Sequence, residues 1–352
     1  MSELMTGRKL EQGAKLQGPV FSFGELLLRL SPVANGAWID EHQLPVYIGG
    51  AELNMASALA CWDIPVQYFT ALPDNYLATD ILAYLAQKKI DTSAIYTSGS
   101  RIGTYYLQQG KDLKQGAVIY DRAYSSFAEL KPGTIDWDTL LTGVGWFHFS
   151  AISPALNAQT AELCREVLQA ATRKKIPVSV DLNYRAKLWQ YSKQPIEIMP
   201  ELMQYCTVVM GNIWSANSLL GVPVNKDIHL LQNRNAYLEH AVQTATDIQK
   251  AYPTVTHIAN TFRFDTISGG IDYYATLFTK GVQYHSAEYT CSTVKDKIGS
   301  GDCFMAGLIK GIYSGETNQQ TIDFATAAAF GKLQETGDAT AQTIQQVKAL
   351  IQ

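Results

Sequence analysis

Four consecutive residues carry the clearest chemical signal in the chain, Gly299, Ser300, Gly301 and Asp302, and the apolar segment 303–309 follows them directly. Small residues at the start of a helix expose consecutive backbone N–H groups, which together with the helix dipole can bind an anion. A carboxylate in the first turn can accept a proton from a hydroxyl group while those donors stabilise charge on a phosphoryl group. Taken alone, the four residues favour a simpler interpretation, a glycine-rich turn with a capping aspartate.

The rest of the chain indicates the elements that would hold this turn. Short β-rich runs alternate with amphipathic helical stretches, which is typical of βαβ units and of a parallel sheet covered by helices. We expect strands at 20–23, 67–70, 146–149, 178–181, 207–210 and 256–259. We expect helices at 53–61, 80–88, 160–173 and 236–251 and, after the turn, at 302–313, 321–332 and 343–350.

Two segments break this alternation, 26–48 and 101–123, and both look like short antiparallel strands and hairpins. We expect them to form a small β-sheet that stands off the main domain as a lid. Residues 1–18 are polar and of mixed charge, which predicts a loosely ordered tail rather than a signal peptide. The remainder, 19–352, is expected to be a single domain because the sequence has no repeats, low-complexity tracts or obvious linkers.

Composition excludes several classes of function. A net charge of −4 and a pI near 5.9 give no electrostatic basis for binding nucleic acid or an anionic membrane. The five cysteines form no CxxC pair and the six histidines have no metal-ligand spacing, so a reducing compartment is expected and metal ligands are not predicted. No apolar run is long enough to span a bilayer. We therefore expect a cytoplasmic protein with neither nucleic acid nor membrane as a partner.

Two other phosphate-binding motifs are absent. The sequence contains no GxxxxGK[ST], which excludes a P-loop. Phe304 stands where the third glycine of GxGxxG would be, and the turn does not follow a first strand, so a dinucleotide-binding fold is not expected.

A Gly-Gly-x-x-x-Asn segment on an early helix, 49–54, followed by the late GxGD turn, resembles the ribokinase-like or PfkB family of carbohydrate kinases. Within that family the sequence is most similar to 2-keto-3-deoxygluconate kinases. The similar segments run in motif order, at 23–32, 72–75, 118–123, 146–149 and 181–185. The resemblance implies a ribokinase-like three-layer α/β/α fold with a mainly parallel central sheet and a small β lid. It also implies ATP and Mg²⁺ as cofactors, and a homodimer formed through the lid.

The resemblance assigns roles around the turn. Asp302 matches the catalytic base, Gly299, Ser300 and Gly301 match the anion hole, and Asp296 matches an acidic residue that precedes it. A local helix cap is the alternative for Asp296. The expected cofactor-binding residues are Asn212, Thr261, Arg263 and Asp296.

The sugar side is implied in the same way. Gly49, Gly50 and Asn54 match sugar-contacting positions, because glycine permits close approach and an amide both donates to and accepts from hydroxyl groups. Asn54 could instead cap or pack at the helix start. Tyr105 or Tyr106 matches a lid tyrosine; adjacent strand residues face opposite sides, so one reaches the pocket and the other packs. Asp181 and Asn183 alternate to one face at a strand end, where α/β sheets place ligands.

Arg122 and Arg185 indicate the substrate class. Arginine binds a carboxylate through two parallel hydrogen bonds, and the matching arginines lie near the acid end of the sugar or the transferring phosphate. A surface salt bridge is the alternative for each arginine. The expected function is ATP-dependent phosphorylation of a small sugar or sugar acid, most simply 2-keto-3-deoxygluconate, at a terminal hydroxyl. A kinase for a neutral sugar such as fructose or ribose is the second interpretation.

Several positions depart from the family pattern, all on the expected nucleotide side. Ser215 replaces the glutamate of an Asn-x-x-Glu motif that begins at Asn212, and tyrosines and glycines fill 269–274 in place of a more regular loop. Lys295, Leu333 and Thr340 also differ from the usual residues. These changes keep a third interpretation open, a non-catalytic sugar-binding relative with a degenerate nucleotide site.

Overall fold

The computed structural model describes residues 10, 13–32, 36–39, 42–108, 118–231, 233–266 and 269–351. The predicted alternation of strands and helices forms one large sheet of order β14-β13-β12-β11-β10-β9-β1-β4, with β15 paired to β13. Its parallel part consists of β4 (Val66–Phe69), β1 (Val20–Phe23), β9 (Trp146–Ser150), β10 (Val178–Asp181), β11 (Val208–Gly211) and β12 (His257–Asp265). These strands are almost continuously buried, as expected for a parallel sheet covered on both faces.

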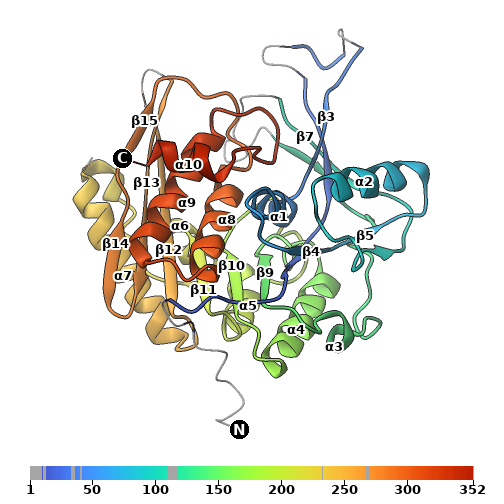
Figure 1. Cartoon of the computed structure of the whole chain (residues 1–352), viewed down its shortest axis with the longest axis horizontal. Helices are drawn as coiled ribbons and strands as arrows, with labels where there is room; N and C mark the ends of the chain where they lie inside the picture. The colour runs from blue at the N-terminus through green and yellow to red at the C-terminus, as the bar shows by residue number, and fades with distance from the viewer. Residues whose placement is uncertain are drawn as a thin grey trace.

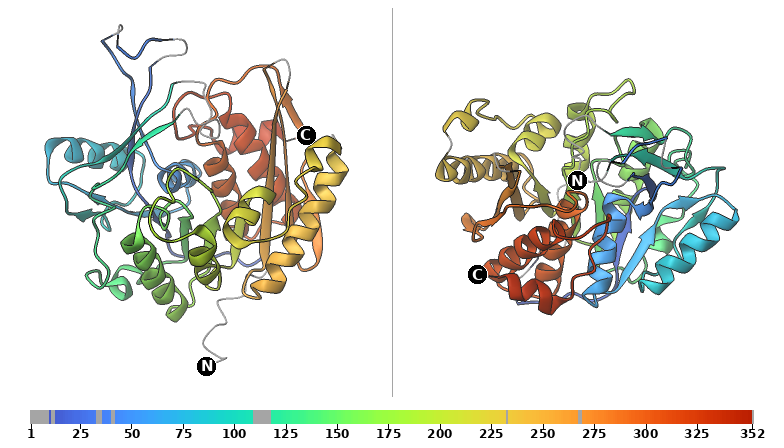
Figure 2. Two further views of the ribbon diagram at one scale, coloured as in Figure 1. Left: turned by 180° about the vertical axis from the view of Figure 1, so that it is seen from behind. Right: turned by 90° about the horizontal axis from the view of Figure 1, so that it is seen from above.

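Helices cover both faces of this sheet, as Figures 1 and 2 show. Alternation along β1 sends Val20 to one core and Phe21 and Phe23 to the other. One face packs against α1 (Ala51–Cys61), α8 (Ser300–Tyr313), α9 (Asn318–Lys332) and α10 (Ile344–Leu350). The other packs against α3 (Trp137–Leu140), α4 (Ala158–Arg173), α5 (Pro195–Met203), α6 (Ile213–Leu220) and α7 (Arg234–Ala251). The expected three-layer α/β/α architecture is therefore confirmed.

The sequence prediction did not include the antiparallel edge of the sheet. It consists of β13 (Ile271–Thr279), β14 (Val282–His285) and β15 (Tyr289–Cys291). Shorter elements complete the chain: α2 (Tyr76–Gln87), the 3₁₀ helix η2 (Ile228–Leu231), and a two-stranded sheet of β5 (Ala71–Leu72) and β6 (Tyr96–Thr97). No helix in the described part of the chain is long and apolar enough to cross a membrane.

A second sheet of order β3-β2-β7-β8 projects from the main body as the expected lid (Figure 1). Its strands are β2 (Leu27–Leu30), β3 (Val46–Gly49), β7 (Gly103–Tyr106) and β8 (Ile119–Asp121). The outer pairs are antiparallel, but β2 and β7 pair in parallel, which corrects the expectation of antiparallel strands alone. The reason is geometric. β2 and β7 run in the same direction and lie side by side in the centre of the lid, and β3 and β8 run back along its two edges.

Parts of three predicted segments lie outside the described residues: 33–35, 40–41 and 109–117 of the two lid segments, and 1–9 and 11–12 of the tail. The end of the predicted tail is not loose. Leu16 is buried and its N–H donates to the carbonyl of Tyr313 at 2.9 Å, while the Tyr313 hydroxyl donates to the Gly18 carbonyl at 2.6 Å. This segment is therefore fixed against α8.

Candidate active site

One cavity brings together most of the residues predicted to do chemistry. It lies where the carboxyl ends of β10 and β11 meet the starts of α1 and α8, beneath the lid strands β7 and β8. The predicted residues that line it are Gly50, Asn54, Tyr105, Arg122, Asp181, Asn183, Arg185, Asn212, Thr261, Arg263, Gly299, Ser300, Gly301 and Asp302. Residues so far apart in sequence converge because the carboxyl ends of parallel strands meet at one edge of a sheet.

The turn at the start of α8 has the geometry of an anion site. Gly299 is the N-cap residue with φ of 78°, and a Cβ there would lie 1.8 Å from the Asp338 carbonyl oxygen, so a larger residue cannot occupy this position. A Cβ added at Gly301 would meet nothing within 4 Å, which leaves open space over the first helical turn. The first N–H groups of a helix lack intrahelical partners, so those of α8 are available to a ligand in the cavity.

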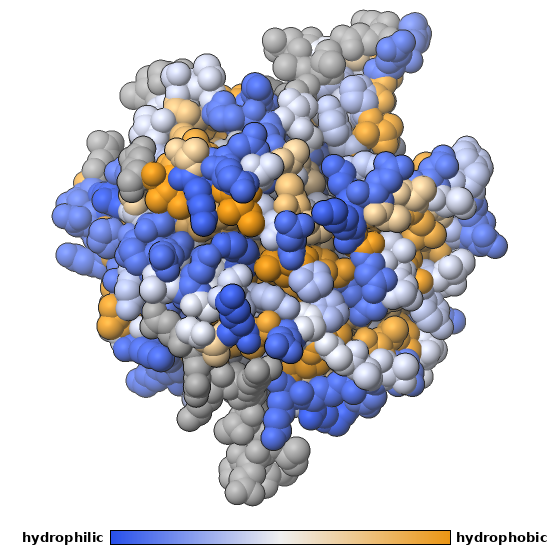
Figure 3. All heavy atoms as spheres, in the orientation of Figure 1, coloured by the Kyte–Doolittle hydropathy of each residue, from blue (hydrophilic) through white to orange (hydrophobic). Residues whose placement is uncertain are grey.

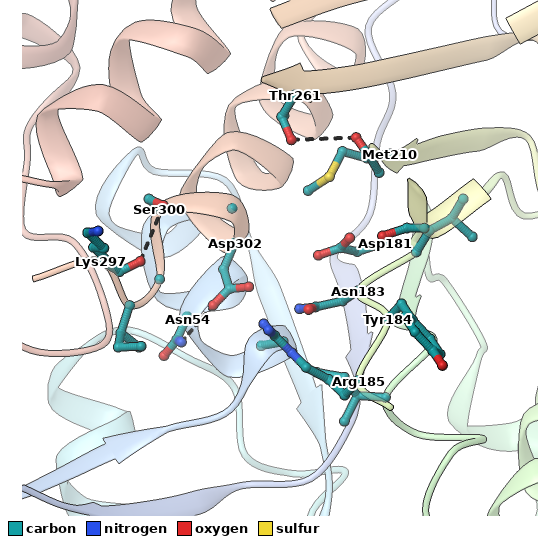
Figure 4. A pocket seen from close by; sticks show the side chains of 18 of the residues that line it. Asn54, Asp181, Asn183, Tyr184, Arg185, Met210, Thr261, Lys297, Ser300 and Asp302 are labelled. Atoms are coloured by element: carbon teal, nitrogen blue, oxygen red, sulfur yellow. Dashed lines mark hydrogen bonds between the residues drawn. The ribbon is translucent and has the colours of Figure 1, made fainter. Parts of the chain in front are cut away.

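Asp302 lies in that first turn and is buried, with 9% of its surface exposed. Its Oδ2 accepts a hydrogen bond from the amide Nδ2 of Asn54 on α1 at 2.8 Å (Figure 4). Burial raises the pKa of Asp302 to about 7, while the Asn54 hydrogen bond and the positive charge of Arg185 oppose that rise. A carboxylate with this pKa is suited to act as a general base near neutral pH.

A second carboxylate faces the same space. Asp181 at the end of β10 points toward Asp302, with Asn183 and Arg185 beside it (Figure 4). Burial, and then the negative charge of Asp302, raise the pKa of Asp181 well above its usual value. No described residue forms a hydrogen bond or ion pair with the Asp181 carboxylate. The cavity therefore holds a buried acidic group whose partner is not supplied by the described chain.

The two arginines differ in what they can offer a ligand. Nε and Nη2 of Arg122 both lie 2.6 Å from Oε2 of Glu25, a carboxylate that also accepts a hydrogen bond from Ser125, and the pair is almost fully buried. Arg122 thus has Nη1 left for a ligand. Arg185 forms no ion pair with any described carboxylate, so its whole guanidinium group is available in the cavity.

The nucleotide side is built by strand and helix ends. Asn212 is the N-cap residue of α6, and its Oδ1 accepts a hydrogen bond from the Ser215 N–H at 2.8 Å. Thr261 donates to the Gly211 carbonyl at 3.5 Å, and Arg263 follows two residues later on β12. Across the described residues, no group of three or more acidic, histidine or cysteine side chains surrounds a common point.

Three predicted residues do not line the cavity. Gly49 packs against Asp338, where a Cβ would lie 2.2 Å from the carboxylate. Tyr106 is on the outer face of the lid with its ring 6.1 Å from that of Trp38, whereas Tyr105 is the tyrosine that reaches the cavity. Asp296 is fully buried behind the turn, and its Oδ2 lies 2.8 Å from Nη2 of Arg29.

The Asp296 position belongs to a buried ionic network that sequence reasoning did not find. Nε of Arg29, on lid strand β2, lies 2.7 Å from Oδ1 of Asp338, and the hydroxyl of Tyr105 donates to Oδ2 of Asp338 at 2.6 Å. Asp296 in turn accepts a hydrogen bond from the Ile298 N–H at 3.1 Å, immediately before the turn. The network thus connects two lid strands to the backbone of the anion site.

Lys297 and Tyr273 are among the cavity residues that were not predicted. Lys297 lines the cavity and its Nζ lies 2.6 Å from Oδ1 of Asp265, and its place two residues before the turn was a usable sequence signal. Tyr273 lines it from β13, a strand that was not predicted.

Comparisons with known proteins identify the family of this chain. The model of the pfkB family of carbohydrate kinases matches residues 19–345. The chain is 26% identical over 333 residues to the 2-dehydro-3-deoxygalactonokinase of Haloferax volcanii, covering 94% of this chain and 95% of that one. It superposes on the crystal structure of 2-dehydro-3-deoxygluconokinase from Thermotoga maritima with a TM-score of 0.85, 31% identity and coverage of 96% and 98%. A PfkB carbohydrate kinase structure from Listeria grayi gives a TM-score of 0.81 at 29% identity, over 94% of this chain and 98% of that one. The chain therefore belongs to the PfkB family of carbohydrate kinases.

Proposed function

We propose that this kinase transfers the terminal phosphoryl group of ATP to the terminal hydroxyl of a small 2-keto-3-deoxy sugar acid, such as 2-keto-3-deoxygluconate. The observation that carries the proposal is the position of Asp302, a buried carboxylate of raised pKa beside an open helix N-terminus. The same cavity contains Arg185, which forms no ion pair with a described carboxylate. The names of the Haloferax and Thermotoga relatives, kinases for 2-dehydro-3-deoxy sugar acids, support the substrate class. The cytoplasm, where ATP is available, is the proposed location.

In this proposal Asp302 takes the proton from the sugar hydroxyl as that oxygen attacks the phosphorus atom. Asn54 holds the carboxylate through its Nδ2, so the second carboxylate oxygen faces the cavity. The N–H groups at the start of α8, together with Arg185, stabilise negative charge on the transferring group. Tyr105 and Leu27 from the lid strands limit the access of water, which would otherwise compete as acceptor.

The residues present fit a phosphate chain. The open space over Gly301 admits one, and the basic residues Arg263 and Lys297 line the wall toward the nucleotide side. Asp181 would hold Mg²⁺, directly or through water, because Ser215 offers only a hydroxyl group where a glutamate is usual. When bound, the metal ion would supply positive charge that neutralises the phosphate oxygens.

Recognition of an acid rests mainly on Arg185. Its guanidinium can bind a carboxylate through two hydrogen bonds, whereas Arg122 is held by Glu25 and adds one donor from Nη1. A neutral sugar would offer no carboxylate to Arg185, which is half-buried and forms no ion pair with a described carboxylate, and this favours the acid over fructose or ribose.

We also propose a homodimer formed through the outer face of the lid. Strand register places Val46, Leu30, Tyr106 and Ile119 in one row across all four lid strands, and Val46 and Ile119 are 55% and 64% exposed. Hydrophobic side chains are visible on the projecting lid in Figure 3. A second copy of the lid would cover this apolar row.

The test is an assay of ADP release with ATP, Mg²⁺ and a panel of 2-keto-3-deoxygluconate, 2-keto-3-deoxygalactonate, fructose and ribose. We expect turnover with the sugar acids and loss of turnover in Asp302→Asn, while Asp80→Asn, at an exposed position of α2, behaves like wild type. Preference for a neutral sugar would contradict the acid assignment. Calorimetric binding of a sugar acid without ADP release would instead support a non-catalytic protein.

A further inference from the structure

Tyr273 is a buried polar residue of the cavity that the proposed chemistry does not yet use. Its side chain lines the cavity from β13, and 2% of its surface is exposed. The hydroxyl group is screened from solvent and forms no hydrogen bond with any described residue. Buried hydroxyl groups in folded proteins almost always have a partner, because leaving one unpaired costs free energy. An orphaned hydroxyl at a ligand cavity therefore points to a partner that arrives with the ligand.

The register of β13 fixes where this hydroxyl lies. Tyr273 pairs directly with Arg263 of β12, and its ring packs in the core that contains Cys303 and Phe304, in the first turns of α8. The next residue, Tyr274, points to the opposite face of the sheet. Tyr273 is thus on the side of the sheet that packs against α8, and it lines the same cavity as the turn that forms the anion site.

The charges around the hydroxyl define the ligand it could meet. Arg263, the register partner of Tyr273 on β12, and Asp181 both line the same cavity as Tyr273. Burial raises the pKa of Tyr273, so the phenol keeps its proton and acts as a donor at any working pH. The complement of a donor at this place is an anionic oxygen.

We propose that the Tyr273 hydroxyl donates a hydrogen bond to an oxygen of the transferring phosphoryl group, opposite the N–H donors of the α8 turn. This inference rests on the proposed kinase function and adds a catalytic residue to it. It gives a role to the tyrosine-containing segment 269–274, which departs from the family pattern. It also adds a donor on the nucleotide side, where Ser215 provides no carboxylate.

The chain supplies a matched control for the test. Tyr274 is 1% exposed and its hydroxyl is likewise without a hydrogen-bond partner in the described chain, but its ring stacks on Phe262 at 5.0 Å, away from the cavity. Tyr273→Phe and Tyr274→Phe each remove one buried hydroxyl and keep the ring. The variants therefore separate a catalytic hydrogen bond from a packing effect.

Three measurements compare these variants with the wild type: steady-state kinetics, thermal unfolding, and calorimetric binding of ADP with aluminium fluoride in the presence of the sugar acid. For Tyr273→Phe we expect kcat to fall about 10- to 100-fold with KM for the sugar changed less than about twofold. Affinity for ADP–aluminium fluoride should fall by a similar factor while affinity for ADP alone is kept. Tyr274→Phe should match the wild type in kinetics and binding.

The inference is overturned if Tyr273→Phe retains both kcat and affinity for the analogue within about twofold of the wild type, or if Tyr274→Phe lowers them equally. A wild-type protein that binds the analogue through Tyr273 without turning over any sugar acid would leave the tyrosine assignment standing and refute the proposed function. If the wild type turned over a sugar acid and Tyr273→Phe did so at the same rate, the proposed function would stand and the tyrosine assignment would be refuted. If the wild type bound no analogue and showed no turnover, both proposals would fail.

Discussion

A stability measurement on Asp302→Asn tests the physical basis of the candidate base. In the wild type, burial raises the pKa of Asp302 from the ordinary 3.8 to about 7, so the folded protein binds this proton more tightly than the unfolded chain. The contribution of Asp302 to the free energy of unfolding is therefore largest below about pH 4, decreases as pH rises toward 7, and is lost above that pH. An asparagine cannot ionise and does not lose this stability. Asp302→Asn should consequently be more stable than the wild type in alkaline buffer while losing activity.

The magnitude follows from the same pKa shift. A rise from 3.8 to about 7, at about 1.4 kcal/mol per unit, gives a ceiling of about 4 kcal/mol for the gain in unfolding free energy at pH 8. A chain of 352 residues unfolds with an entropy near 0.7 kcal/mol per kelvin, so this gain corresponds to an increase in Tm of about 5 °C. The amide oxygen introduced by Asp302→Asn can still accept the hydrogen bond from Asn54, so local packing is kept.

The assay is thermal and urea unfolding of wild type and Asp302→Asn at pH 4 and pH 8, with ADP release measured on the same samples. We expect the Tm difference to be near zero at pH 4 and positive at pH 8, together with a loss of kcat of at least about 100-fold. Asp80→Asn, at an exposed position of α2, is the control for charge removal and should show neither effect. Equal or lower stability of Asp302→Asn at pH 8 would refute the argument that burial perturbs this carboxylate.

Three further outcomes are expected. The value of kcat/KM should rise with pH and level off above about pH 7, because Asp302 must be deprotonated; a profile that is flat between pH 5.5 and 8.5 would contradict this. Arg185→Ala should raise KM for a sugar acid about 10- to 100-fold with little change in Tm. Arg122→Ala should also raise KM, and in addition it should lower the free energy of unfolding in urea by about 3 kcal/mol, because it leaves the buried Glu25 carboxylate without its cation. If the proposed lid dimer forms, the wild type should be a dimer in light scattering and Ile119→Lys a monomer, because the lysine places a charge in the exposed apolar row; a wild-type monomer would contradict the proposal.

The parallel half of the fold was accessible from sequence because its strands are buried on both faces. Such strands appear as short, nearly continuous apolar runs, and the predicted run at 146–149 coincides with β9, which is buried throughout. The antiparallel edge was missed because Asp272 and four tyrosine or threonine residues interrupt the apolar run of β13, and its place is set by pairing with β12 rather than by local pattern. The parallel pairing of β2 with β7 likewise depends on register between distant segments, which no local signal encodes.

The candidate site also contains residues that the sequence could predict and contacts that it could not. Residues at the ends of predicted strands and helices, such as Asp181 and Asp302, could be expected to converge once a parallel sheet was predicted. Contacts such as that of Arg29 with Asp338 could not, because they join segments about 300 residues apart through side-chain geometry alone. Asp296 shows the limit: it lies close to the turn in sequence, but its carboxylate faces the buried network and does not line the cavity.

Two buried acidic pairs flank the glycine turn, and their different surroundings indicate which one serves chemistry. Asp296 and Asp338 both lie within ion-pair distance of Arg29, and the side chains of all three are fully buried, so their charges are compensated inside the fold. Removing one of these three side chains would leave a buried charge without a partner, so we interpret this group as stabilising the contact between the lid and the turn. Asp302 and Asp181 face each other across the cavity, and only Asp302 has a hydrogen-bond partner among the described residues. Two carboxylates that face each other repel when both are ionised, and a bound proton or cation relieves this repulsion. The unfavourable repulsion therefore occurs where a substrate is expected to bind, which indicates that this pair serves chemistry.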